Sequence, residues 1–338
     1  MADPGERSRP RLRDVAALAG VSTMTVVRVL RDRDKVAEAT RARVEAVIRS
    51  TGYTPDLMAR GLASARSGIV AAIVPLLTNS LIAETIQGLT DALVEGEMHL
   101  LIGASGFSAP QEEELIRAFL SRRVEALHLT GTSHTAASVD MLRAARIPVV
   151  EGANLPPTPI DMVVGYSNRD AAETLTRHLI VRGYDPIGYI GADPRDNDRA
   201  RDRRAGYEDA LVRAGRTPDP SLCVETMLDI PAGGRAMASL LDRRPDLRAV
   251  FCSADAIAAG ALFECQRRGI AVPGRIAVGG FDDIDIAGQV VPALTTIRVP
   301  RYRMGFESGR LICDRLAGRA IERRVLDLGF ELVIRDSA

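Results

Sequence analysis

The order of hydrophobic and polar positions changes near residue 68 of this 338-residue chain. Before that point apolar residues recur at helical spacing, which predicts short helices over residues 12–19, 22–31 and 37–50. After it, short apolar runs alternate with helical segments, an order typical of a parallel sheet covered on both faces. The pattern therefore predicts a small helical segment, residues 1–67, followed by an α/β core, residues 68–338.

The core pattern consists of two successive runs of apolar strands and helices. Strands are expected at Ile69–Pro75, His99–Ile102, Ala126–Leu129, Pro148–Val150, Met162–Val164, Ile187–Ile190, Val250–Cys252 and Ala277–Gly280. Helices are expected near residues 80–95, 108–122, 136–145, 170–182, 202–214, 233–242 and 256–268. Two such runs predict two doubly wound, parallel-sheet subdomains. Because ligands of open parallel sheets bind beyond the carboxyl ends of the strands, we expect a ligand site where the subdomains face each other.

The first two helices and the turn Ala19-Gly20-Val21 between them form a helix-turn-helix pattern. Ser22 is a good N-cap for the second helix, in which Val26, Val29 and Leu30 share one face. The opposite face carries Thr23, Met24, Val27, Arg28 and Arg31. Such a unit is too small to hold an enzyme active site, but its second helix fits the major groove of DNA.

Charge is distributed unevenly between the two segments. Residues 1–67 contain thirteen Lys or Arg and eight Asp or Glu, whereas the remainder contains 31 and 36. A basic first segment suits contact with a polyanion, although ordinary surface variation also produces an asymmetry of this size.

Several function classes lack their sequence signals. The four cysteines and four histidines have no metal-ligand spacing, and no nucleophile–base pattern or glycine-rich phosphate loop is present. We therefore expect no metal, no cofactor and no enzyme activity. The polar N-terminus and the absence of a long apolar run predict a soluble, cytoplasmic protein without a membrane partner.

Three parts of the sequence together carry a family resemblance. They are Asp14–Ser22 (DVAALAGVS), the tetrapeptide Gly52-Tyr53-Thr54-Pro55, and Gly280–Asp283 (GFDD) with Pro292–Ile297 (PALTTI). On these motifs the chain resembles the LacI family of bacterial transcriptional repressors over nearly its whole length. Five further segments resemble the gluconate-utilisation branch: Thr23–Val26, Ile147–Glu151, Val250–Cys252, Phe263–Arg267 and Leu326–Phe330.

The resemblance implies a homodimer with an N-terminal reading head, a hinge helix near residues 56–63 and a core similar to periplasmic sugar-binding proteins. It also implies three crossings between the subdomains, which we expect near Gly165–Asn168, Thr296–Val299 and Arg323–Leu326. These crossings would place residues 68–166 with 298–324 in one subdomain and residues 167–297 with 325–338 in the other.

The resemblance also implies how DNA is contacted. Thr23 and Met24 take base-contacting positions. Arg28 either donates two hydrogen bonds to a guanine edge or contacts only phosphate. The guanine contact is worth about 1–3 kcal/mol of discrimination against other bases. Ser22 and Thr25 suit phosphates. Val27, where the family often has Ser, either meets a thymine methyl or contributes nothing. Leu62 either enters the minor groove at the centre of a pseudo-palindromic operator or packs on its own hinge helix, and a hinge dimer permits both.

Candidate effector contacts follow from the same resemblance and from strand ends. By resemblance, Arg203 holds a carboxylate and Asp282 accepts from sugar hydroxyls, unless they form a surface ion pair and a turn. Asn79, His134, Glu151 and Tyr166 lie near strand ends or crossings, and each is equally compatible with a structural role. Ala254 and Ser167 replace residues that are often Asn and Asp in the family.

A sugar acid such as gluconate is the first expectation for the effector, with a different sugar or metabolite as the alternative. A solute-binding protein or a sugar-converting enzyme is less favoured. Closure of the cleft around the effector is expected to weaken the hinge helices and release the operator. Some family members bind DNA more tightly with ligand, so the sequence leaves the sign of this effect open.

Overall fold

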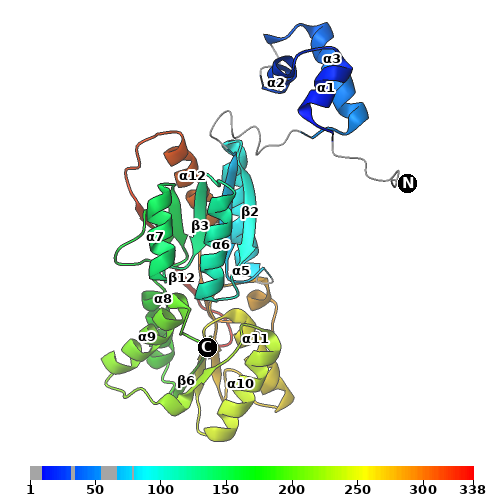
Figure 1. Ribbon diagram of the computed structural model, residues 1–338. Helices are drawn as coiled ribbons and strands as arrows, with labels where there is room; N and C mark the ends of the chain where they lie inside the picture. The colour runs from blue at the N-terminus through cyan, green and yellow to red at the C-terminus, as the bar shows by residue number, and fades with distance from the viewer. Residues whose placement is uncertain (1–9, 32–34, 55–66, 78–79) are drawn as a thin grey trace, which may run out of the picture. The chain divides into compact units, whose positions relative to one another are not determined.

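The computed structural model describes residues 10–31, 35–54, 67–77 and 80–338. The chain divides into two compact units, residues 1–67 and residues 68–338 (Figure 1). Among the described residues, no helix combines the length and the apolar character that crossing a bilayer requires. The hinge segment 56–63 and Leu62 lie outside the described residues, as does Asn79.

The first unit consists of the helices α1 (Leu12–Ala19), α2 (Thr23–Arg31) and α3 (Glu38–Thr51). Each contributes to a small shared core in which Val15, Val26 and Val44 are fully buried. Helix α1 ends at Gly20, whose φ of 64° lies in the left-handed region that glycine adopts without strain. At the other end of α1, the backbone N–H of Arg11 donates to the Asp14 carboxylate over 2.8 Å.

The second unit begins with a parallel sheet in the order β11-β5-β4-β3-β1-β2. Its strands are β1 (Ile69–Val74), β2 (His99–Ala104), β3 (Ala126–Thr130), β4 (Val149–Gly152), β5 (Met162–Gly165) and β11 (Val325–Asp327). Its helices are α5 (Ser80–Glu95), α6 (Ala109–Ser121), α7 (Ala136–Ala145) and α12 (Arg301–Leu316). Alternation along β1 separates the two faces: Val70 packs with α5 and α12, and Ala71 packs with α6 and α7. We call this sheet and its helices the N-terminal subdomain.

The second parallel sheet has the order β7-β6-β8-β9. Its strands are β6 (Ile187–Gly191), β7 (Cys223–Glu225), β8 (Ala249–Cys252) and β9 (Ala277–Gly279). Its helices are α8 (Asn168–Val181), α9 (Asp198–Arg213), α10 (Ile230–Arg243) and α11 (Asp255–Arg267). Phe251 faces α8 and α9, and its neighbour Val250 faces α10 and α11. We call this group the C-terminal subdomain.

One expected crossing between the subdomains is wrong in position. Residues 323–326 were expected to lead into the C-terminal subdomain, but β11 pairs with β5 through Val325 opposite Val163. The chain therefore completes the edge of the first sheet before it crosses, and only then forms β12 (Glu331–Val333) against β10 (Thr296–Arg298). Three residues with alternating exposure are too short a run to reveal such an edge strand from sequence.

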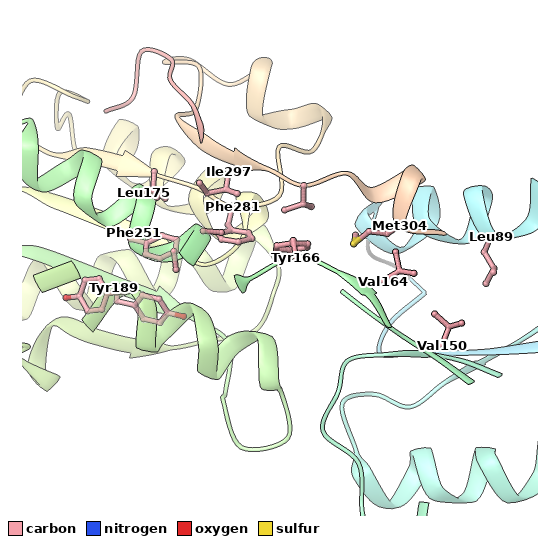
Figure 2. Packing of buried hydrophobic residues seen from close by; sticks show 14 of the residues in the cluster. Leu89, Val150, Val164, Tyr166, Leu175, Tyr189, Phe251, Phe281, Ile297 and Met304 are labelled. Carbon is pink, nitrogen blue, oxygen red and sulfur yellow. The ribbon is translucent and has the colours of Figure 1, made fainter. Parts of the chain in front are cut away.

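A continuous hydrophobic core joins the subdomains at the crossings. Figure 2 shows Tyr166, the residue after β5, between Phe281 and Met304. The rings of Tyr166 and Phe281 are 6.4 Å apart, and Phe281 is in turn 6.3 Å from Phe251. These ring pairs lie in the range in which aromatic side chains add to the stability gained from burial. The floor of the cleft is therefore built on packed aromatic residues.

Helices α5 and α12 approach so closely that glycine is required on both. A Cβ atom on Gly305 of α12 would lie 1.8 Å from the Thr85 carbonyl oxygen. A Cβ atom on Gly88 of α5 would lie 2.1 Å from the Tyr302 carbonyl oxygen. Backbone atoms of a packed helix cannot move aside as the end of a flexible side chain can, so these positions fix the spacing of the two helices.

We predict that Gly305→Ala lowers the free energy of unfolding by about 2–3 kcal/mol, because overpacking outweighs the higher helix propensity of alanine. Urea unfolding followed by circular dichroism measures the loss. Gly288→Ala is the matched control, since a Cβ atom at Gly288 meets nothing within 4 Å. Equal unfolding midpoints for the two variants would contradict the assignment.

Candidate DNA-binding helix and effector cleft

Helix α2 presents a polar face outside the core of the first unit. Ser22 caps it, because the Ser22 Oγ accepts the Thr25 backbone N–H over 3.1 Å and lies 2.9 Å from the Thr25 Oγ1. Val26 and Val29 are buried, which turns the opposite side outward. The exposed residues are Ser22, Thr23, Met24, Val27 and Arg28, and Thr25 is half-buried.

This face suits the edges of base pairs. Met24 is 65% exposed, so its apolar side chain is available for contact with another molecule. Arg28 lies one turn after Met24 on the same exposed side. A short helix with an apolar tip and a guanidinium fork can contact thymine methyl groups and guanine edges in the major groove.

The cleft of the second unit lies at the switch points of both sheets. In the first sheet the strand order reverses between β1 and β3, and in the second between β6 and β8. The residues that follow these four strands, or end them, line one cavity: Pro75, Thr130, Ala192 and Ser253. A doubly wound sheet opens a crevice at this point because neighbouring helices leave on opposite faces.

Arg203 of α9 is the charged group at the floor of this cavity. Its guanidinium donates through Nε to Asn168 over 2.9 Å and through Nη1 to the Ser253 carbonyl oxygen. Its Nη2 lies 3.1 Å from the Tyr166 hydroxyl and 3.4 Å from the Asp282 carboxylate. The guanidinium carbon also lies 3.7 Å from the centre of the Phe281 ring, a cation–π contact.

Asp282 and Tyr166 complete this polar group. Asp282 has a φ of 109°, and its N–H donates to the Ile297 carbonyl oxygen of β10 over 2.8 Å. Burial raises the pKa of Asp282, whereas the charges of Arg203 and Arg301 act in the opposite direction. Burial likewise raises the pKa of Tyr166, so its hydroxyl stays protonated. Three of the predicted effector residues, Arg203, Asp282 and Tyr166, therefore come together.

The cleft has two neighbouring chambers that share part of their lining. The inner chamber, at Arg203, has a free volume of about 60 Å³ and a largely apolar wall that includes Leu76, Ile82 and Met304. The outer chamber has a free volume of about 500 Å³ and is lined mainly by polar residues: Ser105, Ser108, Thr132, Ser133, Thr135, Arg195 and Arg201. Pro75, Phe107, Thr130 and Arg199 line both chambers.

Direct hydrogen bonds join the two subdomains at and beside the outer chamber. The Asp198 carboxylate at the start of α9 accepts from the Thr132 N–H over 3.0 Å and from the Thr132 hydroxyl over 2.8 Å. The Asn154 amide donates to Asp198 over 2.9 Å and to Asp202 over 2.7 Å. Burial raises the pKa of Asp198, but Arg199 and these hydrogen bonds lower it more. The carboxylate is therefore charged and holds the two walls together.

Sequence reasoning missed this contact because it began the helix near residue 202. Helix α9 begins one turn earlier, at Asp198, and Asn197 caps it by accepting the Ala200 N–H over 3.2 Å. An Asn followed by an Asp is a recognisable helix start, and this signal could have placed Asp198 and Arg199 at the cleft.

Two family profiles match the chain. Residues 11–56 match "Bacterial regulatory proteins, lacI family", and residues 176–338 match "Periplasmic binding protein-like domain". The transcriptional regulator GntR of Escherichia coli K12 is 34% identical over 327 residues, which are 97% of this chain and 98% of that protein. GntR of Pseudomonas aeruginosa is 38% identical over 331 residues, 97% of this chain and 96% of that protein. The chain belongs to the LacI family.

Solved structures agree with this assignment. A LacI-family regulator from Silicibacter pomeroyi is 32% identical, covers 97% of this chain and 99% of its own, and has a TM-score of 0.90. The operator-bound lac repressor dimer, at 24% identity and a TM-score of 0.82, shares the fold. The predicted family and the predicted combination of a helix-turn-helix head with a parallel-sheet core are confirmed. This LacI-family chain is a transcriptional regulator and not an enzyme.

His134 and Glu151 of this LacI-family chain form a buried charge cluster instead of facing the inner chamber. The His134 Nδ1 lies 2.7 Å from Glu112, and its Nε2 lies 3.5 Å from Glu151. The other oxygen of Glu151 accepts the Ile160 N–H over 2.6 Å. His134 lines the outer chamber, whereas Glu151 lines neither chamber. We therefore assign Glu151 a structural role, since its carboxylate is already occupied.

This cluster makes the stability of the regulator depend on pH. Burial alone would lower the pKa of His134, but hydrogen bonds and charges from Glu112 and Glu151 raise it to about 9. The folded-state pKa thus exceeds the unfolded value near 6.5. The stabilisation, on the order of 3 kcal/mol, is fully present below pH 6.5 and is lost as the pH rises through 9.

We predict that wild type is more stable than His134→Gln at pH 6.5 and that this advantage largely disappears at pH 9.5. Urea unfolding at the two pH values measures it, and only the difference between the two proteins is used, so that other titrating groups cancel. His99→Gln, at an exposed position of β2, is the control. A pH-independent gap would rule out a charged His134.

Proposed function

We propose that this LacI-family regulator is a homodimeric repressor that binds a pseudo-palindromic operator and is controlled by a sugar acid, gluconate or a relative of it. The observation that carries the proposal is the buried Arg203 guanidinium, which lines a cleft between two subdomains and has Asp282 beside it. A buried cation at a ligand site suits an anionic ligand, and a neighbouring carboxylate suits hydroxyl groups.

The DNA step rests on the exposed face of α2. Thr23 and Met24 contact bases at the start of the helix, Arg28 forks onto a guanine, and Ser22 and Thr25 bind phosphates. A twofold-symmetric dimer places two such helices in successive major grooves, which requires two symmetric half-sites. Leu62 remains our proposal for the minor-groove contact at the operator centre.

The effector step rests on the inner chamber. The carboxylate of the acid accepts hydrogen bonds from Arg203 in place of some of its internal acceptors. The Asp282 carboxylate accepts from ligand hydroxyls, and the Tyr166 hydroxyl donates to them or accepts from them. Asn79 is proposed as a further contact from the N-terminal subdomain. CelR, a regulator 32% identical to this chain with a TM-score of 0.72, has been solved as a complex with cellobiose. A polyhydroxylated ligand is therefore compatible with this fold.

Coupling follows from the size of the inner chamber. About 60 Å³ holds on the order of two water molecules, whereas small-molecule pockets usually measure about 300–1,000 Å³. We propose that a six-carbon acid that reaches Arg203 widens the inner chamber and that the contacts of Asp198 with Thr132 rearrange at the same time. Since the ligand binds one arrangement of the subdomains better than another, it shifts their equilibrium. We propose that this shift lowers the affinity of the dimer for its operator. By linkage, operator binding then lowers the affinity for the ligand by the same factor.

We predict that Arg28→Ala lowers the preference for operator over random duplex by about tenfold to a hundredfold, because one guanine contact is worth about 1–3 kcal/mol. Fluorescence anisotropy with an operator selected from a random pool measures the ratio of the two Kd values. Arg117→Ala, at an exposed position of α6, removes the same charge from the other unit. An unchanged ratio in Arg28→Ala would show that Arg28 contacts only phosphate.

We predict that Arg203→Gln retains operator binding and loses the response to gluconate, because the substitution removes the charge that pairs with the carboxylate. Operator titrations with and without gluconate measure the response, and a melting curve checks folding, since Asp282 is left unpaired. Arg204→Gln changes the neighbouring residue of α9, which pairs with Glu208 instead. A wild type that gluconate leaves unchanged at saturation would refute the effector, and a responsive Arg203→Gln would refute the site.

A further inference from the structure

His128 is a buried titratable residue that the proposed contacts do not use. It lies on β3, between Leu127 and Leu129, and faces the opposite side of the sheet from them, so that its side chain lines the inner chamber. The residue is 1% exposed. Burial lowers the pKa of His128 to about 4, so the imidazole is neutral at physiological pH.

The ring of His128 has an unsatisfied polar atom. Its Nδ1 is buried and has no hydrogen-bond partner within the described part of the chain. Leaving a buried polar atom unpaired is unfavourable, and native structures retain few such atoms without a reason. The ring also occupies space that the chain leaves open for it: a Cβ atom on Gly152 would lie 2.8 Å from the His128 Nε2.

The ring of His128 lies on the N-terminal wall of the inner chamber. His128 belongs to the N-terminal subdomain, whereas Arg203 and Asp282 belong to the C-terminal subdomain and line the same chamber. The other N-terminal residues of this wall include the apolar Leu76, Ile82 and Met304. On that side, His128 and Thr130 are therefore among the few groups that can recognise a polar part of a ligand.

We propose that His128 is a specificity-determining contact that binds a hydroxyl group of the effector through its free ring nitrogen. This inference rests on the proposed effector site and adds a ligand contact from the N-terminal wall of the chamber. A neutral imidazole has one donor and one acceptor nitrogen, and a hydroxyl group both donates and accepts. A hydroxyl therefore satisfies the ring in either tautomer, whereas a carboxylate can only accept.

The contact with His128 affects which acids the cleft selects. The carboxylate of the acid meets Arg203, and a hydroxyl further along the carbon chain meets His128, so the ligand bridges the two subdomains. A site built to pair with a hydroxyl rejects an analogue that lacks it, because the protein group is then left unpaired in the complex. The loss of affinity that depends on His128 should therefore be larger for an acid that lacks this hydroxyl than for an acid of a different chain length.

The test compares two substitutions of His128 with one control. His128→Leu keeps most of the volume and removes both nitrogens, whereas His128→Asn keeps a polar atom near the position of Nδ1. His99→Leu makes the same change at an exposed position of β2. The probes are D-gluconate and a series of six-carbon acids that each lack one hydroxyl, and calorimetry measures their Kd values.

We expect His128→Leu to raise the Kd for gluconate at least tenfold, His128→Asn to raise it less than threefold, and His99→Leu to leave it unchanged. One member of the deoxy series should bind wild type as weakly as gluconate binds His128→Leu. The His128→Leu protein should not distinguish that member from gluconate. A residue with a purely structural role would produce no such match between one ligand hydroxyl and one side chain.

The possible failures are distinct. If His128→Leu binds gluconate as wild type does, or loses affinity equally for every acid in the series, the hydroxyl contact is wrong and the effector site stands. If neither gluconate nor any related acid binds wild type, the proposed effector is wrong and the role of His128 falls with it. A melting temperature of ligand-free His128→Leu well below that of wild type would show that the ring is structural.

Discussion

The buried guanidinium of Arg203 constrains the rest of this regulator. An arginine excluded from water is tolerated only if acceptors surround it, because an unpaired buried charge costs several kcal/mol. Here Asn168, Ser253, Tyr166 and Asp282 supply those acceptors, and Phe281 supplies a ring face. They come from α8, the end of β8, the first crossing and the loop after β9, so pairing one side chain fixes the parts that form the cleft floor.

The dimensions and internal hydrogen bonds of the cleft underlie the coupling that we propose. The inner chamber is narrow, and hydrogen bonds of Asp198 with Thr132 and Asn154 join the two subdomains beside the outer chamber. These bonds hold one arrangement of the subdomains without a ligand. In the proposed mechanism an effector competes with these bonds, so that part of its binding energy moves the subdomains.

Sequence patterns located most elements because the elements are local or strongly periodic. Helix α1 begins and ends where the pattern placed it, and Ser22 caps α2 as expected. Misplacements arose where the signal depends on partners. Helix α12 was not among the expected helices, and its glycines, such as Gly305, are explained only by the backbone of α5 that they meet. Strand β11 is three residues long, and only the edge of β5 makes it a strand.

For the site, the sequence by itself determined the residue types and the family: a helix-turn-helix face with Arg28, and an Arg203 and Asp282 that match family positions. It did not determine which of these residues lie next to one another in the folded protein. Only the folded chain separated Glu151 from Tyr166: Glu151 contacts His134 and lines neither chamber, whereas Tyr166 lies beside Arg203. Only the folded chain brought His128 and Asp198 to the cleft. The reason is that periodicity reports which side of its own element a residue faces, whereas a binding site depends on which elements meet there.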